Sequence, residues 1–411
     1  MRIAYIAPYQ GPALVRRRPV VQNLRLAGRV KMQRIAELLQ SNGHEVEIFS
    51  QGEVIELQLK IFPGFTDPEP FHPKIPVYYS SAFPVRFLNG LWSGLTLLHI
   101  FRARNRVAPF DVVLLYNLKA AQVMCARYAI KRLGLPIILE YEDNAFVDRA
   151  GKREAGLTAE FYLLLAKRLL KSISACVAVS PELLSQTPAS IPKLMLRGIV
   201  GEEIVKGAKR VTDSRKNWVV FSGTLGRTYG LENLIKAWEM LNLPDWELHI
   251  AGDGELRDRL HRLAADVHGI VLDGLLNRDQ NAALLCSAKI GVNPHDSTAI
   301  SGNIFAFKIV EYLAAGTHVL TARMGGLPAE LEKAVTYLSD NTPAVIAATL
   351  RQLIERRCYE RTASEPTLQM YGPDAVGKSL NELISTVTDR HNTGRGKSNL
   401  ASQVRLEPCS E

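Results

Sequence analysis

The stretch that decides the fold is Phe221-Ser-Gly-Thr-Leu-Gly-Arg-Thr-Tyr-Gly-Leu-Glu-Asn-Leu234. An apolar strand, Trp218–Gly223, leads into closely spaced glycines, and a helical pattern begins near Gly230. Backbone amides exposed by glycine and the positive end of a helix together form an anion site suited to a diphosphate. A purely structural turn explains one such segment equally well, so its meaning depends on the sequence around it.

Short apolar strands and helical periods alternate in both directions from this stretch. The first half offers five candidate strands: Arg2–Ala7, Glu45–Phe49, Val112–Tyr116, Ile137–Tyr141 and Ala175–Ser180. The series restarts at Trp218–Gly223 and continues with Trp246–Ala251, Ile270–Asp273, Ile290–Asn293, His318–Leu320 and Thr336–Leu338. Strands this apolar are typical of parallel sheets that crossover helices cover on both faces. The sequence therefore predicts an α/β protein.

The restart of the strand series sets the expected domain organisation. We expect a Rossmann-like domain over residues 1–200, a polar linker over 201–216 and a second Rossmann-like domain over 217–390. Residues 391–411 show no periodicity and are expected to be a disordered tail. A chain of 411 residues is long enough for two full cores. Open α/β sheets bind ligands at the carboxyl ends of their strands, so two such domains are expected to face a central cleft.

Composition and missing motifs exclude several classes of protein. Hydrophobic residues are 47% and charged residues 22% of the chain, as in soluble globular proteins. The five cysteines form no CxxC pair, which argues against disulfides and structural zinc and favours a cytoplasmic location. The longest weakly polar stretch, 87–101, is shorter than the roughly 20 residues of a membrane-spanning helix. No P-loop, HExxH, GxSxG or early GxGxxG motif is found.

Positive charge is concentrated near the N-terminus. Residues 1–110 contain 14 Lys and Arg against 7 Asp and Glu, a net charge of +7, with three consecutive arginines at Arg16–Arg18. This asymmetry predicts an anionic partner such as acidic lipid, phosphorylated substrate or nucleic acid, although a solvated basic face explains it as well. The absence of a basic motif interleaved with aromatic residues argues against nucleic acid. The apolar segment Phe87–Phe101 predicts either an interfacial membrane helix or a helix packed into the core.

Three further segments follow the first in a fixed order. They are His249-Ile-Ala-Gly-Asp-Gly-Glu-Leu-Arg257, the stretch 274–294, and Gly302-Asn-Ile-Phe-Ala-Phe-Lys-Ile-Val-Glu-Tyr-Leu-Ala-Ala-Gly316. In this order and spacing, the four segments resemble the C-terminal half of the GT-B glycosyltransferases, specifically the retaining family 4 (glycosyl transferases group 1). The resemblance is strong over residues 215–340 and weaker over 1–50 and 110–200.

The resemblance implies both a fold and an activity. The fold is GT-B, with two Rossmann-like parallel-sheet domains. The activity is retaining, metal-independent glycosyl transfer without a cofactor, from a nucleotide-diphosphate sugar in the C-terminal lobe. The acceptor, a glycan or a lipid-phosphate-linked glycan of polysaccharide or glycoconjugate synthesis, is expected in the N-terminal lobe. With the basic charge, this predicts a cytoplasmic enzyme that is peripheral on the inner face of an anionic membrane.

The family's donor motif, Glu-x7-Glu, falls on Asn303 and Glu311. The family implies that Glu311 binds the donor ribose, because a carboxylate can accept two hydrogen bonds from a vicinal diol. The alternative is an ion pair on the helix surface with Lys308, three residues earlier. Asn303 replaces the first glutamate and can hydrogen-bond sugar hydroxyls without contributing charge.

The two cations that the family places on the diphosphate fall on Thr224 and Tyr229, so both are missing. Negative charge grows on the diphosphate as the glycosidic bond breaks, so other groups must stabilise it. We expect Arg227 and Lys308 to do so, together with the helix N-terminus near Ile304 and Phe305 and the turn at Gly223 and Thr224. A solvated loop arginine is the alternative for Arg227.

Many family members have a histidine after the strand that here reads Ile137–Tyr141. Glu142 occupies that position and Asp143 follows it. The two carboxylates at the end of a strand can orient or deprotonate an acceptor hydroxyl, or they can cap the next helix. Together with Arg227, they are the candidate catalytic residues. Asp296 is a further acid on a loop near the expected donor sugar.

Three other functions remain open from the sequence. A sugar-nucleotide 2-epimerase shares the fold but needs more acid and base groups around the sugar than Asn303 and its neighbours offer. A non-catalytic GT-B partner that binds nucleotide or an enzyme is favoured by the missing cations and histidine. A nucleic-acid-binding protein is favoured only by the basic N-terminal quarter.

Overall fold

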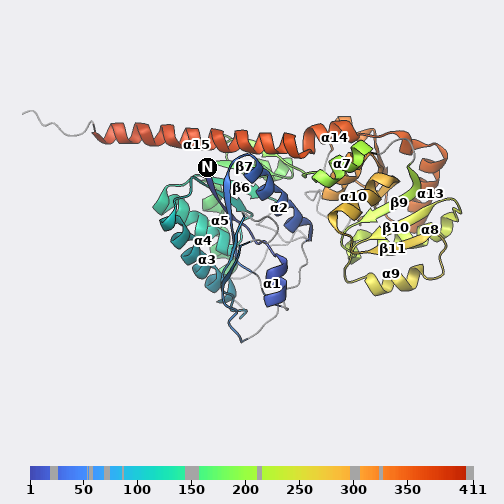
Figure 1. Ribbon diagram of the computed structural model, residues 1–411, viewed down its shortest axis with the longest axis horizontal. Coiled ribbons are helices and arrows are strands. Elements are labelled where there is room, and N and C mark those ends of the chain that lie inside the picture. The colour runs from blue at the N-terminus through green and yellow to red at the C-terminus, as the bar shows by residue number, and fades with distance from the viewer. Residues whose placement is uncertain are drawn as a thin grey trace, which may run out of the picture.

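The computed structural model describes residues 1–18, 26–52, 54, 59–68, 75–85, 88–143, 157–210, 215–296, 306–323 and 327–403. For residues 26–27, 157–161 and 394–403 it describes the backbone alone. The described strands form two separate sheets of eight and six strands. Figure 1 shows each sheet with its own helices, and a long helix, α15, that joins the two halves of the molecule.

The first sheet has the strand order β3-β4-β2-β1-β5-β6-β7-β8. All its pairs are parallel except β3 with β4. The strands are β1 (Arg2–Ile6), β2 (Glu45–Ser50), β3 (Phe65–Asp67), β4 (Val77–Tyr79), β5 (Val112–Tyr116), β6 (Ile137–Tyr141), β7 (Ala175–Ala178) and β8 (Lys193–Met195). Every residue of β5, β6 and β7 is buried, as expected for strands covered on both faces.

The second sheet has the order β11-β10-β9-β12-β13-β14 and is parallel throughout. Its strands are β9 (Lys216–Ser222), β10 (Glu247–Ala251), β11 (Ile270–Gly274), β12 (Ala288–Asn293), β13 (His318–Ala322) and β14 (Val335–Leu338). The order reverses between β9 and β12, and the helices that follow these strands, α8 (Leu231–Leu241) and α11 (Phe307–Ala315), pack into different hydrophobic cores of the second half. Such a switch point is the usual ligand site of an open α/β sheet.

The helices of the first half are α1 (Pro12–Arg17), α2 (Leu26–Ser41), α3 (Leu88–Val107), α4 (Ala120–Tyr128), α5 (Leu157–Leu170) and α6 (Pro181–Ser185). Those of the second half are α7 (Glu202–Arg210), α8 (Leu231–Leu241), α9 (Arg257–Ala264), α10 (Arg278–Ser287), α11 (Phe307–Ala315), α12 (Ala329–Glu332), α13 (Pro343–Glu355), α14 (Ser364–Tyr371) and α15 (Pro373–Gln403). Helix α2 ends just before Gly43, whose φ of 81° suits glycine, as the Asn42-Gly43 pair predicts. Helix α10 begins with a capping box between Asn277 and Gln280.

Two segments differ from the expected linker and domain boundary. Residues 202–210, expected to be a linker, form α7, which packs against α10 and α11. Helix α15, expected within the second domain and then in a disordered tail, packs instead against α2 and β8 of the first half. Its buried side chains join the core that covers one face of the first sheet. The apolar residues of α15 recur at helical spacing, so their burial there follows from ordinary amphipathic packing.

The segment 391–403 is helical, where the sequence predicts a disordered tail. No proline occurs between Pro373 and Pro408, so no proline ends the helix before residue 403. Residues 404–411 of the expected tail lie outside the described residues.

Candidate active site

The loop after β9 and the loop after β10 are joined through glycine. A Cβ atom on Gly252, which has φ of +137°, would lie only 1.8 Å from the carbonyl oxygen of Gly223. The backbone N–H of Gly223 donates to Ala251 (3.0 Å), and that of Leu225 donates to Asp253 (3.0 Å). Only glycine permits this approach, so the two glycine turns singled out in the sequence act as one unit.

The loop after β12 joins the same edge of the sheet. A Cβ on Gly230, with φ of +66°, would lie 2.0 Å from the carbonyl oxygen of Pro294. The backbone N–H of Asp296 donates to the carbonyl of Thr228 at 3.0 Å. The carboxyl ends of β9, β10 and β12 therefore carry one connected set of loops, at the switch point where ligands are expected.

Lys308 extends from the start of α11 to these loops. Its Nζ lies 3.7 Å from the centroid of the Phe221 ring and 4.8 Å from that of Tyr229. A Cβ on Gly223 would be 2.7 Å from Nζ, so the ammonium group lies against the glycine turn. Within the described ranges, Nζ is buried and makes no hydrogen bond. Burial lowers the pKa of Lys308 to about 7, and the charge of Glu311 opposes that effect.

His295 lies beside this lysine and was not singled out in the sequence. Its ring stacks at a tilt on Tyr229, with 4.8 Å between centroids. Burial and then the charge of Lys308 lower the pKa of His295 to about 4, so the imidazole is neutral at physiological pH. A neutral imidazole can still donate or accept one hydrogen bond toward a bound sugar. Its position directly after the Asn293-Pro294 pair at the end of β12 was the available signal.

Glu311 lies one turn after Lys308 on α11, and its ion pair is with a residue of the other half of the chain. Oε1 accepts a hydrogen bond of 2.9 Å from Nη1 of Arg34, on α2. The sequence offered Lys308 as the alternative ion-pair partner, and among the described residues the paired cation is Arg34. Residues 303–305, which contain the expected donor residues Asn303, Ile304 and Phe305, lie outside the described part of the chain.

Arg227, on the loop after β9, lies at the protein surface. Its side chain is 81% exposed and lies 3.5 Å from Glu255, which also accepts the backbone N–H of Arg227 at 3.2 Å. Thr224 is half-buried on the same loop. The structure thus brings Gly223 and Lys308 together with Phe221 and Tyr229 and leaves Arg227 paired at the surface.

Glu142 and Asp143 follow β6 and have partners within the first half. Glu142 forms an ion pair with Lys31 of α2. Asp143 accepts a hydrogen bond of 3.2 Å from Asn117. The side-chain oxygen of Asn117 in turn accepts the backbone N–H of Glu142 (2.8 Å) and of Asp143 (3.1 Å). Asn117 adopts a φ of +57°, a strained conformation for a residue other than glycine.

A buried carboxylate lies beneath this pair. Glu140 of β6 is fully buried, accepts a hydrogen bond from Tyr5 and lies 3.7 Å from Nζ of Lys31. Burial raises the pKa of Glu140 to about 7 and also raises the pKa of Glu142, while the charge of Lys31 opposes both effects. The Lys31 ammonium group therefore lies close to both carboxyl groups. This network of ion pairs and hydrogen bonds fixes the position of Glu142.

Helix α2 links the two groups of candidate residues. Lys31 and Arg34 lie one turn apart, and they hold Glu142 and Glu311 respectively. In the described residues no group of three or more His, Cys, Asp and Glu side chains is arranged to hold a metal ion.

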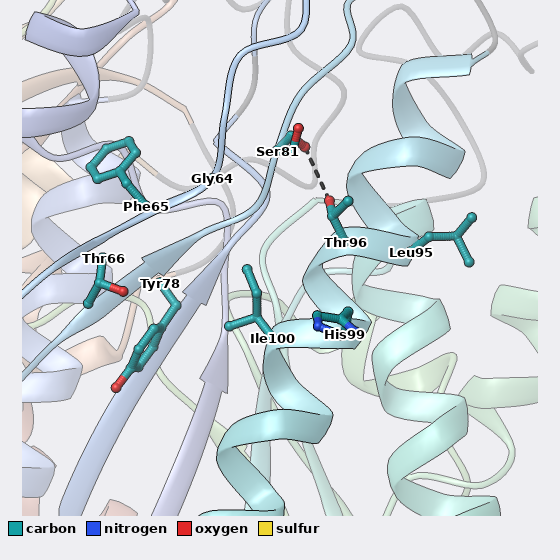
Figure 2. A pocket seen from close by; sticks show the side chains of 9 residues that line it. All are labelled: Gly64, Phe65, Thr66, Tyr78, Ser81, Leu95, Thr96, His99 and Ile100. Carbon is teal, nitrogen blue, oxygen red and sulfur yellow. Dashed lines mark hydrogen bonds between the residues drawn. The ribbon is translucent and has the colours of Figure 1, made fainter.

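A separate apolar depression of about 490 Å³ lies in the first half between β3, β4 and α3. Figure 2 shows Phe65, Tyr78 and Ile100 around it, with Thr96 of α3 hydrogen-bonded to Ser81. The full lining is Gly64, Phe65, Thr66, Tyr78, Ser81, Leu95, Thr96, His99 and Ile100. Within the part of the chain described, no helix has the length and apolarity required to span a bilayer.

The chain has one mainly parallel and one wholly parallel sheet, a helix that returns from the second half to the first, and glycine loops with a buried lysine at a switch point. These features define a two-domain α/β protein of the GT-B class. The model of the glycosyl transferases group 1 family matches residues 205–367, and that of the glycosyl transferase 4-like domain matches residues 27–190. The chain belongs to the glycosyl transferases group 1 family. The expected fold and family are confirmed.

Solved structures support the fold across nearly the whole chain. Sucrose-phosphate synthase from Thermosynechococcus elongatus has a TM-score of 0.67 at 14% identity, covering 95% of this chain and all of its own. The Anabaena protein HepE in complex with UDP-glucose has a TM-score of 0.59 at 15% identity, covering 94% of this chain and all of its own. At such identities the likeness shows the fold alone.

A curated relative matches a shorter stretch. The GDP-mannose-dependent alpha-(1-6)-phosphatidylinositol dimannoside mannosyltransferase of Mycobacterium tuberculosis is 32% identical over 137 residues, 30% of this chain. The match spans about a third (33%) of the length of that relative.

Proposed function

We propose that the protein is a retaining glycosyltransferase that moves a sugar from a nucleotide-diphosphate donor to a glycan or lipid-linked acceptor. The observation that carries the proposal is the buried Lys308 ammonium group, which lies against the glycine turn with no hydrogen-bond partner among the described residues. Burial of a cation without a hydrogen-bond partner costs free energy unless a bound ligand supplies an opposite charge. A diphosphate bound on the turn supplies the missing anion.

The proposed roles of the donor-site residues follow from the negative charge of the leaving diphosphate. Glycosyl transfer leaves negative charge on the diphosphate, and a fixed cation in a dry site stabilises that charge best. Lys308 takes this role, and Glu311 on the next turn of α11 accepts the ribose hydroxyls. Arg227 remains a second candidate cation, and it must leave Glu255 to reach the donor. The site needs no metal ion in this proposal, because Lys308 and the loop amides neutralise the leaving group.

The first domain supplies the acceptor side. Glu142 and Asp143 are held at the carboxyl end of β6 by Lys31 and Asn117, so their positions are fixed before substrate binds. We assign them to orienting the acceptor hydroxyl. The raised pKa of Glu142 brings its titration closer to neutral pH, which suits a group that exchanges a proton with the acceptor.

An anionic membrane is the proposed location of the acceptor. On α3, Leu88, Leu91, Trp92 and Leu95 are exposed, whereas Leu97 is buried in the core. One face of this helix is thus packed into the core, as one of the two expectations had it, and the apolar side chains of the other face are open to an interface. Arg16 and Arg17 are exposed at the end of α1, and the Arg17 guanidinium lies 4.2 Å from the Phe65 ring of the apolar depression. Basic and apolar groups on one domain favour an acidic interface.

Two sugar nucleotides are to be tested as donors, because they occur in the names of similar proteins. The M. tuberculosis relative is named for GDP-mannose, and HepE was solved with UDP-glucose. The test is to incubate the protein with radiolabelled UDP-glucose or GDP-mannose and vesicles that contain a lipid-linked glycan, and to follow label into the lipid phase. Transfer with retained anomeric configuration, abolished by Lys308→Met, is expected. Conversion of the sugar nucleotide to an epimer without acceptor would identify an epimerase instead, and nucleotide binding without turnover on any acceptor would favour a non-catalytic partner.

The membrane proposal has its own test. Vesicle co-sedimentation is expected to show binding to acidic vesicles, weakened by salt through the arginines and by Leu91→Gln and Trp92→Gln through lost apolar contact. Val107→Gln is the matched control, because Val107 is also exposed on α3 but lies at its far end. Absence of binding to acidic vesicles at low salt would exclude the membrane and indicate a soluble acceptor.

A further inference from the structure

The guanidinium group of Arg34 is shared between the two domains. Arg34 lies on α2 in the first domain and is 6% exposed. Nη1 donates to the Ile199 carbonyl (2.6 Å) and to Glu311 (2.9 Å), and Nη2 donates to Glu203 (2.9 Å). Glu203 is on α7 and Glu311 on α11, two helices of the second domain that pack together. One cation of the first domain thus holds two carboxylates of the second.

Near this contact the chain has glycine at two positions where a side chain would collide with its neighbours. A Cβ on Gly201 would lie 2.6 Å from Nη2 of Arg34 and 2.1 Å from Oε1 of Glu203. A Cβ on Gly198 would lie 2.9 Å from the Phe307 ring, over which the Arg34 guanidinium lies at 5.5 Å. A side chain at position 201 would therefore collide with the guanidinium group and with Glu203, and one at position 198 would collide with the ring on which the guanidinium lies.

The geometry of arginine makes this contact directional. A guanidinium group is planar and presents its N–H donors in a fixed fork, so each acceptor is held at a defined angle. Arg34 has several partners and little exposure, so its own position is fixed by the Ile199 carbonyl and Glu203. Glu311, bound to the same fork, is restricted to one orientation. A carboxylate has about four acceptor positions, so Glu311 can bind Arg34 and a diol at once.

We propose that Arg34 is a positioning residue of the donor site, which fixes the Glu311 carboxylate in the orientation that accepts the ribose hydroxyls of a nucleoside diphosphate. Recognition of ribose in the second domain then depends on a side chain of the first. The inference rests on the proposed function, in which Glu311 binds the donor ribose.

The test compares ribonucleotides with 2′-deoxyribonucleotides. Calorimetry measures the affinity of the whole protein for UDP, GDP and their 2′-deoxy forms. Loss of a hydrogen bond to a charged group lowers affinity by roughly tenfold or more, so the wild type is expected to prefer the ribo form by about that factor. Arg34→Gln is expected to reduce the preference to about twofold or less by weakening the ribonucleotide and leaving the deoxynucleotide nearly unchanged. Arg34→Lys, which keeps the charge but not the fork, is expected to fall between the two.

Two matched variants control for a general effect on the domain contact. Glu203→Gln keeps an oxygen to accept from Arg34 and leaves Glu311 in place. Glu37→Gln removes a second ion pair between the domains, in which Glu37 of α2 lies 3.7 Å from Arg278 of α10. Both are expected to keep the preference for ribose of the wild type. Because Arg34 acts through Glu311, the double variant Arg34→Gln with Glu311→Gln is expected to have the same preference as Glu311→Gln alone.

Three results would overturn the positioning role of Arg34. A preference abolished by Glu311→Gln but intact in Arg34→Gln and Arg34→Lys overturns this inference and leaves the proposed function standing. Equal weakening of both nucleotide forms by Arg34→Gln indicates a purely structural role and overturns it too. A wild type that binds ribo and deoxy forms equally overturns the assignment of Glu311 to ribose, and the positioning role of Arg34 with it.

Discussion

Lys308 is the residue at which folding and function oppose each other. Its ammonium group lies buried between Phe221 and Tyr229, where cation–π contact compensates only part of the lost hydration. A protein selected for stability alone would place an apolar side chain there. The lysine is retained, in our account, for the negative charge that develops on the leaving diphosphate.

A nucleoside diphosphate is expected to bind with uptake of a proton. The pKa of Lys308 is about 7, lowered from 10.5, so the free amine is mostly neutral at pH 8. A diphosphate favours the ammonium form and raises that pKa. Binding at pH 8 should therefore take up on the order of one proton, and affinity should fall as pH rises from 7 to 9. Calorimetry in buffers of different ionisation enthalpy counts the protons.

Lys308→Met is the control for this measurement. It should bind UDP and GDP more weakly than the wild type at pH 7, and it should take up no proton at pH 8. Equal proton uptake by the variant and the wild type would assign the titration to another group and remove Lys308 from the donor site.

Substitution of Gly252 tests the contact between the loops after β9 and β10. Alanine at 252 must accommodate a Cβ only 1.8 Å from the Gly223 carbonyl oxygen, so the backbone must shift. Alanine at Gly274 meets no atom within 4 Å and has only an unfavourable φ of +69° to overcome, a cost of roughly 1 kcal/mol. We expect Gly252→Ala to lower the free energy of unfolding by clearly more than Gly274→Ala, and to weaken nucleotide binding as well. Urea unfolding and calorimetry measure both, and equal effects of the two variants would show that the loops tolerate separation.

At the scale of elements, apolar strands were predicted best. The ends of β5 and β6 agree with the sequence prediction to the residue, because β5 is apolar or aromatic throughout and β6 is so except at the buried Glu140. Strands β3, β4 and β8 were not predicted, since three residues are too few to show a period. Helix α7 was taken for linker because most of its residues are charged and the only one it buries is Ile204.

The candidate site was predictable only where its residues are close in sequence. Glu311 was singled out by the family's Glu-x7-Glu motif, and Lys308 by its place in the first turn of the same helix. Arg34 lies 277 residues from Glu311, and a single sequence contains no signal for that pairing. A general signal did exist: Lys31 and Arg34 share a face of α2 with the buried Ile35, and cations on an apolar face need buried partners.

Helix α15 connects the two domains, because it starts in the second domain and packs on the first (Figure 1). Its side chains Val376, Leu380, Leu383, Ile384 and Val387 complete the core beneath β1 and α2. Asn381 of α15 is also hydrogen-bonded to His44 at 2.8 Å. The first domain therefore depends for its core on residues from the end of the chain.

This dependence predicts that Leu380→Ala destabilises the first domain. Removal of a buried leucine costs about 2–5 kcal/mol. Lys378→Ala, on the exposed side of the same helix, should change stability by no more than about 0.5 kcal/mol. Hydrogen exchange of the β1 amides reports on the first domain separately from the second. If exchange at β1 were as slow in Leu380→Ala as in Lys378→Ala, α15 would be an appendage and not part of that core.

A crystal structure with UDP or GDP bound would show whether Lys308 and Glu311 hold the nucleotide. We expect a diphosphate oxygen within about 3 Å of Nζ of Lys308, a hydrogen-bond distance. We also expect the ribose hydroxyls on the Glu311 carboxylate and the diphosphate over the turn at Gly223. A nucleotide bound elsewhere, with Lys308 still enclosed by Phe221 and Tyr229 and facing no phosphate, would remove both residues from the donor site.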